Sequence, residues 1–229
     1  MTLASGAIDK VKIIDDQPDA AEWLSYEVEE AGFQPIIVTC PAPPLDQLHS
    51  LIEPGAAFIF DHRLSPGNCA SYVGAEAAAL MYGFKVPALL VTTFSMDADV
   101  GIRRWRAGIP VLLDRDAVDQ DSLNAAFLKC LRELSDGPPP SRQPLAAIVR
   151  VERRSSEPGE PVLDVIVGSW NPRKAVRLPV SLLPLNLRES VKEGTRLIAD
   201  VNIGAENGDE LFFQNFREAP EPNPNDGLT

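Results

Sequence analysis

Five short apolar segments alternate with helical patterns over the first 135 residues, and this alternation constrains the fold more than any other feature. The apolar segments are continuous rather than alternating in polarity, as expected for strands that are covered on both faces. They lie at residues 11–15, 35–39, 56–61, 87–93 and 110–114. The helical patterns between and after them lie at residues 18–32, 44–55, 70–83, 97–108 and 119–134. This order predicts an α/β fold, a doubly wound five-stranded parallel sheet with helices on both faces.

Acidic residues stand at the carboxyl ends of two of the predicted strands. Asp15 and Asp16 follow the first strand, and Asp61 ends the third. Ligands of such sheets bind at the carboxyl ends of the strands. Three carboxylates brought together there cannot all stay ionised without a counter-charge, and Mg²⁺, a hard cation that prefers oxygen ligands, is the natural one. Taken alone, however, the acidic pair could equally be solvated loop residues or could cap the helix that follows.

These residues resemble the receiver domains of bacterial response regulators over roughly residues 10–135. The segment VKIIDDQP is similar to the metal-binding acidic pair of that family, and FIFDHRLSPG is similar to its phosphoacceptor segment. The resemblance implies a flavodoxin-like receiver fold and phosphorylation of Asp61 by a histidine kinase or another phosphodonor. It further implies that the backbone carbonyl of Arg63 binds the metal and that Thr92 contacts the phosphoryl group. Asp16 and Asp61 are 45 residues apart, and Asp61 and Thr92 are 31 apart, close to the usual spacings of the family.

The chain departs from the family at the end of the fifth strand, where receivers usually carry a lysine. Counted from Thr92 without gaps, that position is Asp114, and a shift of one residue makes it Arg115. An aspartate there has the wrong sign for a site that accepts a phosphoryl group. Arginine supplies a cation, but its planar fork differs from a compact ammonium group. Two interpretations therefore stay open: a phosphorylated receiver, or a pseudo-receiver that serves as a scaffold without phosphorylation.

The second part of the chain has a different pattern. Residues 136–144 are rich in proline and predict a semi-rigid linker. Between residues 145 and 217, five short and mostly alternating segments are separated by turn signals, which predicts a small antiparallel β-barrel with meander connections. Residues 218–229 are rich in Pro, Asn and acidic residues and predict a disordered acidic tail. The predicted domains are thus 1–135 and 145–217.

Charge limits the classes of partner. The formal net charge is −12, and residues 1–140 carry 10 Lys and Arg against 20 Asp and Glu. Because binding to phosphate backbones needs a basic surplus, DNA is not an expected partner. A protein partner is expected instead, either on the fourth-helix face around GIRRWRAG (residues 101–108) or on the barrel, and a homodimer is possible. Without a lysine or a general base after the carboxylates, we do not expect an enzyme.

The cysteines and the hydropathy bear on the compartment. Cys40, Cys69 and Cys130 are odd in number, far apart and without metal-ligand spacing. A disulfide framework is therefore not expected, and the chain is predicted to be reduced and cytoplasmic. No apolar run approaches the ~20 residues that cross a membrane, and residues 1–10 do not have the pattern of a signal peptide.

Overall fold

The structure of the protein is a computed structural model, which describes residues 8–64, 69–93, 100–156 and 160–220. The chain forms two compact units, and neither is continuous in sequence. The N-terminal unit comprises Met1–Ser95 and Trp105–Pro138, and the C-terminal unit comprises Met96–Arg104 and Pro139–Thr229.

The N-terminal unit is built on a parallel sheet. Its strands are β1 (Lys10–Ile14), β2 (Gln34–Ile37), β3 (Ala56–Asp61), β4 (Ala88–Thr92) and β5 (Val111–Asp114). The order across the sheet is β2-β1-β3-β4-β5, and every neighbouring pair is parallel. The predicted doubly wound five-stranded sheet is confirmed, and its order is the flavodoxin-like one. β3 and β4 are buried along their whole length, which explains their continuous apolar sequence.

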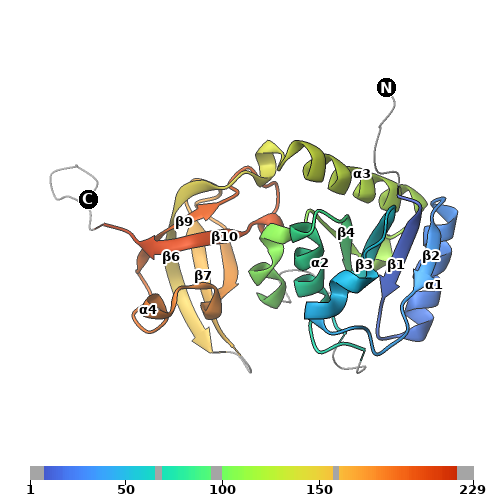
Figure 1. The fold of residues 1–229 in the computed structure, drawn as a ribbon. Helices are drawn as coiled ribbons and strands as arrows, with labels where there is room; N and C mark the ends of the chain where they lie inside the picture. Colours follow the sequence, from blue (N-terminus) through green and yellow to red (C-terminus); the bar gives the residue numbers. More distant parts are fainter. Residues whose placement is uncertain (1–7, 65–68, 94–99, 157–159, 221–229) are drawn as a thin grey trace. The chain divides into compact units, whose positions relative to one another are not determined.

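Helices cover both faces of this sheet (Figure 1). On one face, α1 (Pro18–Glu30) and α3 (Gln120–Asp136) pack in one apolar cluster with the strands. On the other, α2 (Gly74–Gly83) packs on β3 and β4, together with the 3₁₀ segments η1 (Leu45–Leu51) and η3 (Arg106–Gly108). Local sequence sets these helix ends. Pro18 opens α1, and the side chain of Asp119 accepts a hydrogen bond from the Ser122 amide at the start of α3.

Two predicted helices are not α-helices. The pattern at 44–55 forms only η1, since Pro44 precedes it and the chain becomes extended at Ile52. The pattern at 97–108 forms η2 (Val100–Arg104) and η3, while its first residues lie outside the described ranges. Glycines at positions 101 and 108 weaken a continuous helix there.

The C-terminal unit holds an antiparallel sheet. Its strands are β6 (Leu145–Ser156), β7 (Pro161–Val167), β8 (Ala175–Pro179), β9 (Arg196–Val201) and β10 (Phe213–Glu218). Their order is β10-β9-β6-β7-β8, so the predicted meander is wrong: β9 pairs with β6 rather than with β8. The β8–β9 connection contains η6 (Val180–Leu182) and α4 (Leu185–Arg188), and it is long enough to carry the chain to the other side of β6. No ladder joins β8 to β10 within the described strands, so the structure shows an antiparallel sheet and does not show a closed barrel.

Segments from outside 145–217 complete this unit. The buried guanidinium of Arg103 in η2 donates to the carbonyl oxygens of Gly208 and Leu211 at 2.9 and 2.8 Å. Here η7 (Gly208–Glu210) lies just before β10. η2 therefore belongs to the C-terminal unit, whereas η3 belongs to the N-terminal one. Binding of a protein partner around residues 101–108 stays a prediction. Within the predicted linker, α3 extends to Asp136 and η5 (Pro140–Arg142) packs with the C-terminal unit.

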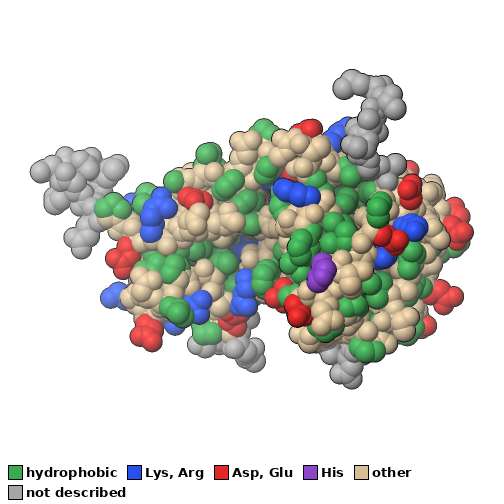
Figure 2. Space-filling view, viewed as in Figure 1, with side chains coloured by type: hydrophobic (Ala, Val, Ile, Leu, Met, Phe, Trp, Pro, Cys, Tyr) green, Lys and Arg blue, Asp and Glu red, His purple; other side chains and the backbone are tan. Residues whose placement is uncertain are grey.

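On the face shown in Figure 2, basic and acidic side chains of the described residues are interspersed with apolar ones. Among the helices in the described ranges, none combines the length and the hydropathy that a bilayer crossing requires. Most of the predicted tail, residues 221–229, lies outside the described residues.

Candidate functional site

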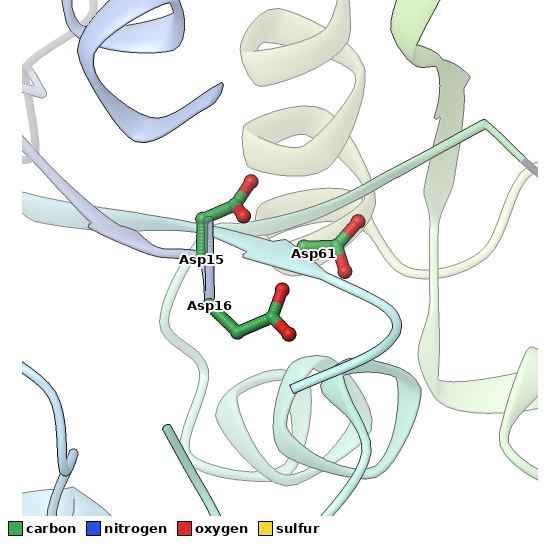
Figure 3. A group of neighbouring side chains, drawn as sticks. All are labelled: Asp15, Asp16 and Asp61. Carbon is green, nitrogen blue, oxygen red and sulfur yellow. The ribbon is translucent and has the colours of Figure 1, made fainter. Parts of the chain in front are cut away.

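The three predicted acids come together at the carboxyl edge of the parallel sheet. β1 and β3 are neighbours, with Ile14 opposite Phe60, so the residues that follow them meet. One carboxylate oxygen from each of Asp15, Asp16 and Asp61 lies within 4.8 Å of the others. Figure 3 shows their carboxylates extending to the same side of the two strand ends. The clustered geometry that the sequence predicted is therefore present.

A cation that directly follows β5 joins two of these acids. The Nη2 atom of Arg115 donates to Oδ2 of Asp15 and to Oδ1 of Asp61, each at 2.7 Å. Asp114 instead accepts a hydrogen bond from the Asp116 amide at 3.1 Å and caps η4 (Arg115–Ala117) on the surface. Of the two residues that the sequence left open, Arg115 is the one that supplies positive charge to the acid cluster.

The surroundings keep Arg115 charged. Burial would by itself lower the pKa of its guanidinium, but the hydrogen bonds and charges of Asp15 and Asp61 outweigh burial and hold this pKa above its usual value. The two carboxylates are almost completely shielded from solvent, with side-chain exposures of 0% and 10%. Arg115 is therefore a permanent counter-charge in the site.

Backbone amides engage the remaining oxygens of the same two acids. Gln17 donates its amide to Oδ1 of Asp15 at 2.9 Å, and Arg63 donates its amide to Oδ2 of Asp61 at 2.7 Å. Asp16 differs, because its Oδ1 is buried and has no hydrogen-bond partner among the described residues. An orphaned buried carboxylate oxygen beside two other acids is the donor that a hard cation such as Mg²⁺ completes. The residues present thus fit a magnesium ion.

The acids open onto a cavity of about 380 Å³. It is lined by Asp16, Gln17, Ala20, Asp61, Arg63, Thr93 and Arg115. Thr92, the threonine that the sequence favoured, is the last residue of β4 and is 2% exposed. The next residue, Thr93, lines the cavity, and sequence reasoning missed it because the register of a strand end cannot be read from composition. A role for Thr92 in contacting a phosphoryl group stays a prediction, as does metal binding by the Arg63 carbonyl.

A glycine allows α2 to lie close to the end of β3. A Cβ atom at Gly74 would lie 1.8 Å from the carbonyl oxygen of Asp61, so no other residue allows this approach. The Gly74 amide donates to the carbonyl of His62 at 3.0 Å. His62 itself is buried. In the sequence, Gly74 is one glycine inside an apolar helical pattern, and nothing in that pattern indicates this close approach.

A disulfide bond lies next to Asp15 of the acid cluster. Cys40, after β2, and Cys69, before α2, form a disulfide with their Cα atoms 4.6 Å apart. The prediction that no disulfide forms is therefore wrong; the pair is 29 residues apart in sequence, and only the fold brings the two loops together. The sulfur atoms lie 3.5 and 3.7 Å from the carbonyl oxygen of Asp15. Cys130 is free and buried.

Solved structures similar to this chain match its N-terminal half. A sensor protein from Polaromonas sp. JS666 is 18% identical, with a TM-score of 0.44, and the match covers 55% of this chain and 98% of that one. The signal receiver domain of a histidine kinase from Syntrophus aciditrophicus is 21% identical, with a TM-score of 0.42, and the match covers 54% and 89%. A response regulator receiver domain protein from Clostridium thermocellum is 15% identical, with a TM-score of 0.44 and coverage of 56% and 97%.

No protein-family model matches the chain, and no curated protein matches it. The fold of the N-terminal unit follows from its own geometry: five parallel strands in the order β2-β1-β3-β4-β5, helices on both faces, and acids gathered at the carboxyl edge. The N-terminal unit thus has the doubly wound, flavodoxin-like fold that receiver domains share, and the second unit is an antiparallel β-sheet.

Proposed function

We propose that this chain is a cytoplasmic signal-transduction protein whose N-terminal unit accepts a phosphoryl group on Asp61. The proposal depends on one observation above all: three carboxylates lie within 4.8 Å of one another beside a cavity, and one of them has a buried oxygen without a partner among the described residues. Asp15, Asp16, Asp61 and the backbone carbonyl of Arg63 would hold Mg²⁺. When bound, the ion would neutralise the charge on the transferring phosphoryl oxygens.

The residues of the chain would act as follows. A histidine kinase or a small acyl phosphate presents its phosphoryl group to the cavity. An oxygen of Asp61 forms the new bond to phosphorus, and the bond from phosphorus to the donor nitrogen or oxygen breaks, with its electron pair leaving on the donor. The product is an aspartyl phosphate. Arg115, which already donates to Asp61, would shift its hydrogen bond to a phosphoryl oxygen, an acceptor that guanidinium groups bind well.

The hydrogen bonds of Arg115 also support an alternative function without phosphorylation. Arg115 already satisfies an oxygen of Asp15 and an oxygen of Asp61, and two backbone amides satisfy the others. In this state the two acids need no metal. The alternative is therefore a pseudo-receiver that holds a stable surface for protein partners without phosphorylation.

The output is proposed to reach a protein partner through the C-terminal unit. Large apolar side chains are exposed on it, at Leu145, Ile148 and Leu185, and exposed apolar side chains of this size are common where proteins bind one another. The surface around residues 101–108 is a second proposed route to a protein partner: Arg103 there is buried, but Arg104 is exposed. Neither DNA nor a membrane is part of the proposal, and a homodimer stays a prediction.

Phosphorylation can be tested with an acyl phosphate and Mg²⁺ on the full chain. The expected result is a mass gain of one phosphoryl group that is lost in Asp61→Asn and kept in Asp114→Asn, a matched change at an exposed acid outside the cluster. Beryllofluoride should bind in the same variants that become phosphorylated. If the wild type gains no mass and binds neither beryllofluoride nor Mg²⁺, the acceptor function is wrong and the scaffold alternative stands.

A further inference from the structure

We propose that Cys40 and Cys69 form a reversible dithiol–disulfide site that adjusts the acid cluster, an inference that rests on the proposed function of Asp61. The disulfide joins the loop after β2 to the loop before α2. Both loops lie next to the end of β1, since each sulfur atom is within 3.7 Å of the carbonyl oxygen of Asp15. The amide of Ala42 donates to the carbonyl of Cys69 at 2.7 Å and joins the same two loops a second time.

The two sulfur atoms contact the backbone of Asp15, one of the three clustered acids. Both lie within 3.7 Å of the carbonyl oxygen of Asp15, whose side chain accepts hydrogen bonds from Arg115 and Gln17. A disulfide has no hydrogen to donate, whereas each free thiol has one. Reduction therefore removes the link between the two loops and gives the Asp15 carbonyl a new donor. Both changes act on the position of the Asp15 carboxylate.

The two cysteines differ in access to solvent, which sets the order of the exchange. Cys40 is exposed, and Cys69 is completely buried. The thiolate of a dithiol reductant can reach the sulfur of Cys40, form a mixed disulfide with it, and displace Cys69 as the leaving thiolate, which takes up a proton. The second thiol of the reductant then releases Cys40, so that the protein gains two thiols while the reductant becomes a disulfide. In the reverse direction, one peroxide molecule oxidises the two thiols and yields two water molecules.

The oxidised form is expected to bind cations more tightly. A cross-link that fixes two loops beside Asp15 pre-organises its carboxylate for a ligand. Such pre-organisation raises affinity by lowering the cost of ordering. Groups that orient a metal ligand commonly change metal affinity by a factor of 10–100. We expect the dissociation constant for Mg²⁺ to rise roughly tenfold on reduction.

The chemistry of the pair is tested by counting thiols in the full chain. After treatment with peroxide and unfolding, alkylation should label only Cys130, and after a dithiol reductant it should label all three cysteines. Cys130→Ser should keep the redox-dependent difference, and Cys40→Ser should remove it. Three labelled cysteines after peroxide, or one after the reductant, would overturn the reversible site.

The coupling is tested by measuring Mg²⁺ affinity in both redox states, with Cys40→Ser/Cys69→Ser as the control that should not respond. Equal affinities in the two states of the wild type would refute the coupling. If neither state binds Mg²⁺, the proposed function fails by itself, and hydrogen exchange then decides the coupling without metal. In that measurement the Gln17 amide, bonded to Asp15 Oδ1, should exchange faster after reduction; an unchanged rate would refute the inference.

Discussion

Replacing Arg115 with methionine should destabilise the N-terminal unit in metal-free buffer by about 3 kcal/mol. The guanidinium makes two hydrogen bonds of 2.7 Å to carboxylates whose side chains are 0% and 10% exposed. Removing one partner of a buried ion pair costs roughly 3–5 kcal/mol, because the remaining charges stay buried without compensation. We take the lower end of this range, since Arg115 is 13% exposed and the cavity beside it admits water.

The same change should make the protein more responsive to Mg²⁺. Without Arg115, no arginine neutralises the three carboxylates, so Mg²⁺ can take its place. A ligand present at 100 times its dissociation constant stabilises the folded state by about 2.7 kcal/mol. Mg²⁺ should stabilise the wild type less, because the ion competes there with the guanidinium of Arg115 for the same carboxylates. The measurement is urea unfolding with and without Mg²⁺. The dependence of the free energy of unfolding on urea concentration should be the same in all samples.

Asp114→Asn is the matched control for this experiment. It changes a neighbouring exposed residue whose side chain accepts the Asp116 amide, a role that asparagine can also fill. Its effect should be below about 0.5 kcal/mol. A loss of less than ~1 kcal/mol in Arg115→Met, or an equal gain from Mg²⁺ in the wild type and the variant, would refute the assignment of Arg115 as the internal counter-charge.

Three further outcomes are expected. Burial raises the pKa of Tyr72 to about 12, so its contribution to the free energy of unfolding is complete below pH ~10. About 2 kcal/mol of this free energy should be lost as the pH rises toward 12, and Tyr72→Phe should remove that loss in unfolding curves. Gly74→Ala should cost more than ~3 kcal/mol in urea unfolding, because a Cβ would meet the Asp61 carbonyl at 1.8 Å; wild-type stability would contradict this approach. Arg103→Met should destabilise the C-terminal unit by roughly 2–4 kcal/mol, since it leaves the carbonyls of Gly208 and Leu211 without this donor, whereas the exposed Arg153→Met should change little.

Local sequence determined the N-terminal architecture and the position of the acids. Continuous apolar segments specify buried parallel strands, and Pro18 and Gly32 bound a helix by their backbone preferences alone. Once the strands are parallel, residues that follow them must meet at one edge. Asp15, Asp16 and Asp61 could therefore be brought together from the sequence without coordinates.

Only the tertiary structure decided which neighbouring residue serves the site. Arg115 rather than Asp114 reaches the acids because β5 ends at Asp114 and η4 turns the next side chain over the sheet edge. Thr93 rather than Thr92 lines the cavity for a similar reason of register. A shift of one residue reverses the direction of a side chain at a strand end, and no composition signal records that shift.

Contacts between distant parts of the chain were also beyond the sequence. Three such contacts join segments that are far apart in the chain. They are the bond between Cys40 and Cys69, the packing of η2 in the C-terminal unit, and the pairing of β9 with β6. Local preferences specify which elements form, since they act within a few residues. Which elements meet is decided by how the apolar faces of the whole chain pack together, and that is a property of the folded protein alone.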